Sequence, residues 1–245
     1  MLSRNVLRKF LITLVALSLF PIIVLADGSD VQFLGMPWLS SVVTVKETVA
    51  SKLTKDLPTG EFERTEWNAT SYGETDVRVK DVPIYTLTYE GKYYYSVAGY
   101  NVASLITKFV PKAEDGTYSD KNFDDYVFIE ATYRFDADSI NDCQDIYDGL
   151  LKKLSSLYGE RTDDYSDNQY ETYYTLVAKG SVWKTSNNGF LELRWAKMSS
   201  SFTGTMEHVY LTYAFDDVDY ITARQEATLD SSGESNLDVG ATNGL

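Results

Sequence analysis

A long amphipathic segment between Ile140 and Tyr158 restricts the possible folds of this chain more than any other feature. Its apolar side chains recur at helical spacing and form one continuous stripe. Asp138 or Ser139 is the predicted start, and Gly159 follows where the end of a helix needs a positive φ. The spacing therefore predicts a helix of about 20 residues, on the order of 30 Å long. Such a helix must bury its stripe against another layer.

Strand-like segments on both sides of this helix supply that layer. In residues 127–135 apolar and polar side chains alternate with the period of two that is typical of a half-buried strand. An earlier helix is predicted to begin with a cap from Ser40 or Ser41 and to run to about Lys55. The predicted strands cover residues 61–68, 77–79, 84–89, 93–99, 102–110, 127–135, 172–184, 190–198 and 208–215.

The order of these segments indicates the fold class. It reads helix, several strands, loop, strand, helix and three strands, and the helices do not alternate with the long apolar runs of a parallel sheet. A doubly wound fold is therefore disfavoured. The sequence predicts an α+β fold in which long amphipathic helices pack on one face of an antiparallel sheet. One larger sheet and two tandem helix-plus-sheet halves both agree with the pattern.

Residues 1–26 have the anatomy of a secretory signal peptide. Arg4, Arg8 and Lys9 precede an uncharged apolar stretch from Phe10 to Leu25, and Ala26 stands at the −1 position of the cleavage site. We expect cleavage after Ala26, which makes the mature chain secreted or extracytoplasmic, with no membrane contact after cleavage. The alternative is an uncleaved anchor. It is disfavoured because the apolar run of about 16 residues is shorter than the roughly 20 needed to span a bilayer.

The composition of the rest of the chain predicts two halves, a loop between them and a C-terminal tail. Residues 27–110 form a predicted N-terminal α+β half, and residues 126–228 form a C-terminal β-α-β-β-β half. Residues 111–125 between them are polar and acidic, which predicts a loop. Residues 229–245 are rich in Ser, Gly, Asn and Asp, which predicts a disordered tail.

Charge and composition exclude several classes of function. The 36 acids against 22 bases give a net charge of −14. Nucleic-acid binding is not expected, because neutralising phosphates needs a basic face. Removal of the three bases before residue 27 leaves 36 acids against 19 bases, a net charge of −17. The chain has one Cys, Cys143, and one His, His208, so the sequence predicts no disulfide, no metal site and no cofactor.

The sequence predicts no catalytic residues. His208 opens a strand whose alternate members are apolar, so it is expected to face solvent, and no G-x-S-x-G motif is present to complete a triad with it. Residues 181–184 match S-x-x-K, but they read as a strand, which places Ser181 and Lys184 on opposite faces. Paired carboxylates for glycoside hydrolysis are recognised only by their separation in space. With 36 acids in the chain, no pair can be selected from the sequence.

One acidic segment has the spacing of a calcium loop. Asp164, Ser166 and Asn168 match the first, third and fifth ligands. Gln169 stands where the loop needs Gly, and Thr175 stands where it needs a bidentate Glu. A solvated acidic loop is therefore the prediction for this segment.

The segment from Gly35 to Ser41 reads Gly-Met-Pro-Trp-Leu-Ser-Ser and opens an amphipathic helix. It resembles the G-I-P-W-G-S/T helix start of uncharacterised exported bacterial proteins, and it departs from that pattern at Leu39, where the group has Gly. The helix start also resembles, more distantly, the small α+β modules of the SmpA/OmlA and β-lactamase-inhibitor-protein type. The resemblance implies an exported α+β protein with no catalytic residues to transfer. Later residues similar to the second half of the exported group are Tyr133, Phe135, Leu157-Tyr158-Gly159, Trp183, Leu191 and Leu193.

Tyrosine is unusually frequent, with 19 residues. Rigid amphipathic rings on an outer sheet face suit a protein or glycan interface. The alternative is that Tyr, with its high strand propensity, fills one face of the sheet and decorates the other. The candidate binding residues are Tyr93, Tyr94, Tyr95, Tyr174 and Tyr210.

These observations favour a non-enzymatic binding module that meets an extracellular protein, peptide or glycan through an aromatic sheet face. The first alternative is a secreted hydrolase that cleaves glycans with carboxylates. The second is an envelope assembly factor, which the SmpA/OmlA resemblance implies.

Overall fold

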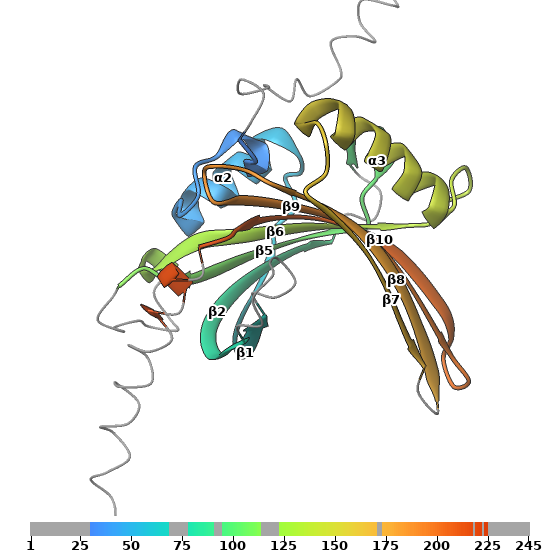
Figure 1. Cartoon of the computed structure of the whole chain (residues 1–245). Helices are drawn as coiled ribbons and strands as arrows, with labels where there is room; N and C mark the ends of the chain where they lie inside the picture. The colour runs from blue at the N-terminus through green and yellow to red at the C-terminus, as the bar shows by residue number, and fades with distance from the viewer. Residues whose placement is uncertain are drawn as a thin grey trace, which may run out of the picture.

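The computed structural model describes residues 30–68, 78–90, 95–113, 123–170, 173–217, 219–221 and 223–224. Its largest element is an eight-stranded antiparallel sheet with the strand order β1-β2-β5-β6-β10-β9-β8-β7 (Figure 1). A separate two-stranded hairpin consists of β3 and β4. The predicted signal peptide and the predicted C-terminal tail lie outside the described residues. The strands are β1 (Thr59–Asn68), β2 (Arg78–Glu90), β3 (Ser96–Val97), β4 (Tyr100–Asn101), β5 (Ser104–Pro111), β6 (Tyr126–Asp136), β7 (Asp163–Tyr170), β8 (Tyr174–Lys184), β9 (Gly189–Ser200) and β10 (Gly204–Phe215).

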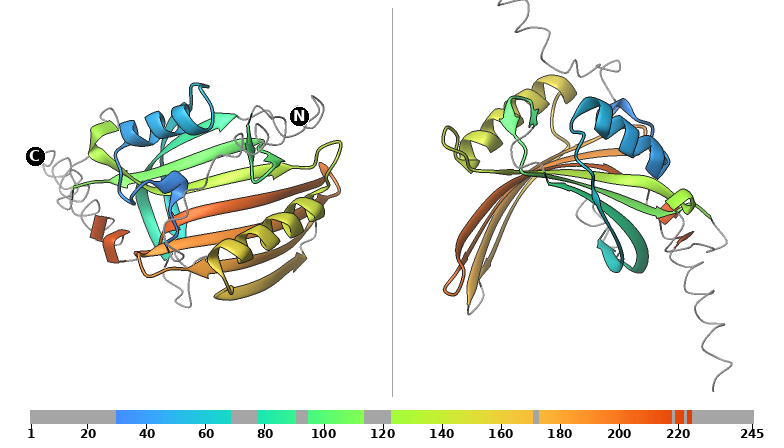
Figure 2. Two further views of the ribbon diagram at one scale, coloured as in Figure 1. Left: turned by 90° about the horizontal axis from the view of Figure 1, so that it is seen from above. Right: turned by 180° about the vertical axis from the view of Figure 1, so that it is seen from behind.

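Two α-helices, α2 (Val42–Lys52) and α3 (Cys143–Tyr158), cover one face of the sheet. The sheet is an arch whose convex face carries both helices and whose opposite face is hollow (Figures 1 and 2). The Ser41 hydroxyl accepts the Thr44 amide at 3.2 Å, which confirms the predicted cap of the first helix. Gly159 ends α3 with a φ of 79°, as predicted. Within the described ranges, neither helix has the length and apolar character needed to span a bilayer. The described residues also include the 3₁₀ turns η1 (Phe33–Gly35) and η3 (Phe123–Asp125).

The predicted fold class, with long helices packed on a sheet, is wrong. The helices have 11 and 16 residues, and the sheet is the dominant element. Strand β6 pairs with β5 on one side and with β10 on the other, so the two predicted halves share a single sheet. The predicted helix also starts too early, since α3 begins at Cys143. Asp138 Oδ1 accepts the amides of Ile140 and Asn141 at 2.7 and 2.8 Å, which forms a turn in place of a first helical turn. Ile140 is 83% exposed as a result.

The acidic segment that is predicted as a loop forms the edge strand β7. It pairs with β8 over its whole length, from Asp163↔Val182 to Tyr170↔Thr175. An edge strand that no helix covers can carry polar side chains on both faces, so its sequence shows no apolar alternation. The C-terminal half therefore contains four strands after α3, whereas three were predicted.

The segment 93–99 is predicted as one strand, and its described part turns back on itself. Ala98 and Gly99 have positive φ values of 52° and 89°. Two successive positive φ values are the geometry of a tight hairpin turn. The chain therefore reverses between β3 and β4, and the predicted strand is wrong in this part.

The main core lies between the sheet and the two helices. Phe33 packs against Phe128, with ring centroids 5.6 Å apart, and both side chains are fully buried. Leu39 has a φ of 64°. That left-handed conformation costs an L-residue about 1–2 kcal/mol. Hydrogen bonds from the Leu39 amide to the Phe128 carbonyl and from the Phe128 amide to the Ser40 carbonyl, both 2.9 Å, hold it in place.

Candidate functional site

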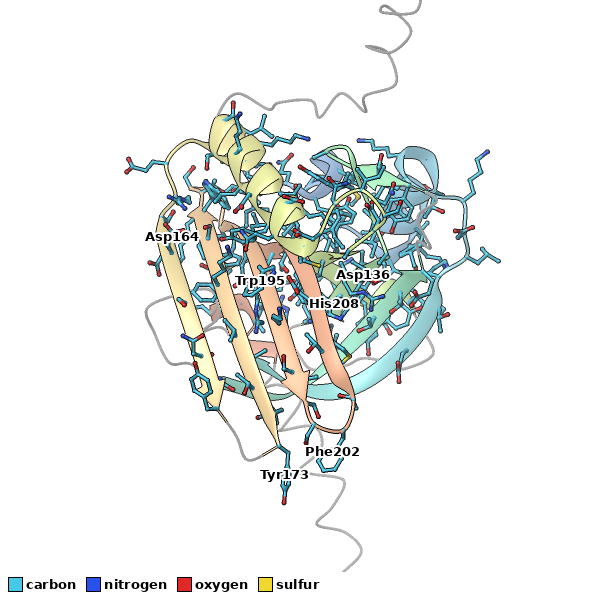
Figure 3. All side chains as sticks on the ribbon, turned by 90° about the vertical axis from the view of Figure 1, so that its right-hand side faces the viewer. Asp136, Asp164, Tyr173, Trp195, Phe202 and His208 are labelled. Carbon is cyan, nitrogen blue, oxygen red and sulfur yellow. The ribbon has the colours of Figure 1, made fainter. Side chains whose placement is uncertain are left out.

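The hollow face of the sheet contains a cleft between β6, β8, β9 and β10. It encloses about 450 Å³, a volume within the range of small-ligand pockets. Leu193 and Leu211 pair across β9 and β10 on the helix side, so the residues next to them in sequence point into the cleft. Strands β7–β10 extend beyond α3 (Figure 3). We call this part of the sheet the wing. The lining residues are Thr132, Leu176, Glu192, Arg194, Ala196, Met198, Met206, His208, Tyr210 and Thr212.

The cleft changes from polar to apolar along its length. Neighbouring rungs of the ladder lie about 6.6 Å apart, because each strand residue rises about 3.3 Å, so the four rungs span about 20 Å. One end therefore offers charged and hydroxyl groups, and the other end offers two thioethers beside an alanine. In order, the pairs across β9 and β10 are Glu192–Thr212, Arg194–Tyr210, Ala196–His208 and Met198–Met206.

Glu192 is a buried carboxylic acid at the polar end. Its side chain is 8% exposed, and its Oε1 accepts a hydrogen bond from the Tyr165 hydroxyl. Burial raises the pKa of Glu192, while the Tyr165 hydrogen bond and the charge of Arg194 oppose that rise. The Tyr165 ring lies over Gly180, where an added Cβ would overlap it. The contact between Tyr165 and Glu192 therefore depends on a glycine in the neighbouring strand.

The remaining polar groups at this end satisfy one another. Thr212 and Thr132 share a hydrogen bond of 3.1 Å between their hydroxyls, and Thr132 donates to Glu130 Oε1 at 3.2 Å. The same Glu130 oxygen lies 3.0 Å from Lys108 Nζ. This chain of contacts fixes the polar end of the cleft to the middle of the sheet.

Arg194 differs from these groups. It forms no ion pair with any residue that the structure describes, and its Nε is buried without a hydrogen-bond partner there. A guanidinium has five donors, which fit carboxylate and phosphate oxygens. The cleft therefore holds one cation whose hydrogen-bonding capacity the described protein groups leave in part unused.

His208 lies on the cleft face of β10, away from the buried Val209 as its place in the alternation predicts, and its side chain is 29% exposed. Its Nδ1 lies 2.7 Å from Asp136 Oδ1, and Arg134 Nε lies 3.3 Å from the same oxygen. Of the described residues that line the cleft, none is Ser or Cys. The His208–Asp136 pair therefore has no Ser or Cys partner among the described lining residues, so this geometry does not form a Ser- or Cys-based triad.

An exposed apolar patch lies at the end of the wing, where two hairpins turn. Tyr173 and Phe202 are 64% and 78% exposed, and their ring centroids lie 5.6 Å apart (Figure 3). Tyr174 and Met206 are exposed next to them, on the strands that lead to the cleft. We call these four residues the tip patch. Residues 198–206 of the second hairpin include no charged side chain, so the patch is apolar and uncharged on that side.

The structure separates the predicted binding tyrosines. Tyr210 lines the cleft, and Tyr174 belongs to the tip patch. Tyr95 is buried in the core on the helix side of the sheet. Tyr93 and Tyr94 lie outside the described residues. The structure thus brings two of the five predicted residues to one surface.

Sequence reasoning missed the groups that give this surface its chemistry. Glu192 and Arg194 stand between the apolar residues Leu191, Leu193 and Trp195. That alternation shows which face they share, but it is also the pattern of a strand with a plain solvated face. Phe202 lies in a run of Ser, Thr and Gly, which reads as a turn.

The two motif matches have structural explanations. Ser181 is buried under α3, where it donates to Asp164 Oδ1 at 2.5 Å and lies 3.1 Å from the Tyr147 hydroxyl. Lys184 pairs with Asp216 at 3.7 Å. It lies three positions after Ser181 along the strand, so the two side chains lie on opposite faces, as predicted. The calcium-like segment lies along the strand β7, which lacks the sharp turn of a calcium loop. Among the described residues, no three His, Cys, Asp or Glu side chains gather to hold a metal ion.

Comparisons of this chain with family models, with curated proteins and with solved structures find no match. The resemblance to exported bacterial proteins stays a prediction that rests on the residues quoted for it.

Replacing Glu192 with Gln is expected to remove a pH-dependent loss of stability. Because burial raises the pKa of Glu192 above its unfolded value, the folded chain binds the proton more tightly than the unfolded chain. The stabilisation from that proton is complete below the unfolded pKa of about 4.3 and is lost as the pH rises through the folded pKa. The free energy of unfolding of Glu192→Gln should therefore exceed that of the parent chain by an amount that grows from pH 4 towards neutral pH.

Urea unfolding at a series of pH values measures this difference. Tyr165→Phe is the companion variant, since it removes a hydrogen bond that lowers the pKa of Glu192, and it should make the loss steeper. Parallel curves for the Gln variant and the parent across the whole range would show that Glu192 does not titrate in a buried site.

Proposed function

We propose that this chain is an exported, non-enzymatic binding module that holds a protein or peptide partner on the tip patch and the adjoining cleft. The observation that carries the proposal is the continuity of the two surfaces. Met206 belongs to both, and Met198 pairs with it across the ladder. The tip patch gives a partner a flat aromatic contact area, and the adjoining cleft, which changes from apolar to polar, can hold an anchoring group.

The chemistry of the patch agrees with a protein interface. Aromatic residues and methionine are enriched at such interfaces, and charged residues are depleted at their centre. Tyr173 and Phe202 already pack on each other, so little conformational entropy is lost when a partner covers them. The net charge of −14 favours a neutral or basic partner at long range.

The geometry supports binding better than glycan hydrolysis. A glycosidase needs two carboxyl groups across the scissile bond, about 5 to 9.5 Å apart. Of the described residues that line the cleft, Glu192 is the only acid. The nearby acid Glu130 is ion-paired with Lys108 and does not line the cleft. The cleft therefore lacks the second carboxylate of that mechanism.

A library of random 12-residue peptides displayed on phage tests the proposal with the purified chain as bait. We expect selection to enrich peptides with aromatic or apolar residues. The double variant Tyr173→Ser/Phe202→Ser should bind the selected peptides at least about tenfold more weakly, because interface aromatics dominate binding energy. Fluorescence anisotropy with the labelled peptides measures the affinities.

Ile140→Ser is the matched control, because it also removes an exposed apolar side chain, in the loop before α3. It should leave the affinities unchanged. Failure to enrich any peptide over an unrelated protein would contradict the proposal, as would an equal loss in the control and the tip-patch variant.

A further inference from the structure

Arg194 is the group in the cleft that most restricts its ligand. It stands at the second rung, beside Tyr210 on β10 and Gly180 on β8. Its guanidinium forms no ion pair with a described residue, so its donors are available to an acceptor that enters the cleft. The acceptor that matches a guanidinium best is a carboxylate, which takes two parallel hydrogen bonds.

The acids near Arg194 are engaged elsewhere. Glu192, its neighbour on the same face, accepts the Tyr165 hydroxyl, and Asp136 is held by His208 and Arg134. A ligand carboxylate can therefore approach Arg194 without displacing an existing ion pair.

The apolar residues of the cleft lie on one side of Arg194, with His208 facing Ala196 at the third rung. Ala196, Met198, Met206 and Leu176 cover the cleft between Arg194 and the tip patch. Met198 is four residues from Arg194 along β9, about 13 Å in an extended strand. Thioether side chains adapt their shape to an apolar chain, so this part of the cleft suits an extended aliphatic or aromatic tail.

We propose that the cleft binds a carboxylate at the end of an apolar chain, with the carboxylate on Arg194 and the tail over Met198 and Met206. This deepens, and rests on, the proposed function, because the acid is the anchor by which a partner is held. Two sources carry this chemistry: the C-terminus of a peptide that ends in apolar residues, and a free fatty acid. Both would place the negative charge at the same rung of the ladder.

Calorimetric titration of the purified chain with octanoate and with octylammonium tests the charge requirement. We expect saturable binding of octanoate and none of octylammonium. Arg194→Gln should weaken octanoate binding at least about tenfold, since it removes a charge-assisted bidentate contact. Lys197→Gln removes the same charge from the same strand on the opposite face, where Lys197 pairs with Glu207, and should leave the affinity within about twofold, as expected of an exposed charge.

A second variant keeps Arg194 and fills the cleft. Ala196→Phe should also abolish octanoate binding, and a thermal unfolding scan of each variant shows that it folds. Equal binding of octanoate and octylammonium, or equal octanoate affinity in Arg194→Gln and Lys197→Gln, would overturn the proposal. So would the absence of saturable binding by any acid probe.

A pair of peptides distinguishes the two sources. Acetyl-Gly-Leu-Phe with a free carboxylate is compared with the same peptide as an amide. Tighter binding of the free acid than of octanoate, lost in the amide, assigns a peptide C-terminus, and the reverse order assigns a fatty acid. If phage-selected peptides still bind the tip patch while every acid probe fails, this inference is overturned and the proposed function stands. If the acids bind and no peptide is selected, the cleft ligand stands and the peptide-binding function falls.

Discussion

Replacement of Trp183 by Ala is expected to lower the free energy of unfolding by about 3–5 kcal/mol. Trp183 is the largest fully buried side chain among the described residues, with 2% exposure. Its Nε1 donates to the carbonyl of Gly159 at 3.3 Å, so it also fastens the end of α3 to the sheet. Ala would leave a cavity and an unpaired carbonyl together. Because a domain is stable by only about 5–15 kcal/mol, the urea midpoint should fall sharply.

Two further variants separate packing from surface effects. Trp183→Phe keeps most of the ring volume and loses the hydrogen bond, so it should cost less than Ala. Phe202→Ala removes an exposed ring of the tip patch and should change the free energy of unfolding by no more than about 0.5 kcal/mol. If Trp183→Ala and Phe202→Ala unfold at the same urea concentration, Trp183 is not part of a close-packed core.

The ends of the helices show which features can be predicted from a few neighbouring residues and which cannot. The Ser41 cap and the Gly159 terminus could be predicted, because a cap needs only a side chain or a positive φ within one turn. The start of α3 could not be placed, because Asp138 can cap a helix or close a turn, and here it closes a turn over Asn141. The choice between the two depends on the direction in which the chain leaves the end of β6, at Asp136.

The extent of the sheet depends on long-range pairing that leaves little trace in a single strand. The polar strand β7 forms because it pairs with the free edge of β8. The sequence of residues 163–170 contains no signal for that pairing. The candidate site has the same origin. The alternation around Arg194 predicts which face it shares, whereas the cleft exists because the sheet curves and brings β6, β8, β9 and β10 around that face. Curvature is a property of the assembled sheet, so it could not be predicted from any one segment.

Arg224→Ala is expected to lower the free energy of unfolding by about 2–4 kcal/mol, because charge-assisted hydrogen bonds to buried carbonyls would be lost. Arg224 lies in the helical residues that follow β10 and is 4% exposed. Its Nε donates to the Pro111 carbonyl at 3.2 Å, and its two terminal nitrogens donate to Tyr220 and Lys112 at 2.9 and 3.3 Å. One side chain therefore joins the end of β5 to the chain after β10, more than a hundred residues later.

The geometry of the guanidinium makes the prediction specific. Arg224→Lys keeps the charge, but a single ammonium cannot reach three carbonyls that lie around a planar fork, so it should recover only a minor part of the loss. Arg161→Ala is the matched arginine control. Arg161 pairs with Asp164 at 3.0 Å near the surface, with 40% of its side chain exposed, and such pairs contribute about 0–1 kcal/mol. Full recovery by Lys, measured by urea unfolding, would show that Arg224 acts through its charge alone and does not join the two segments.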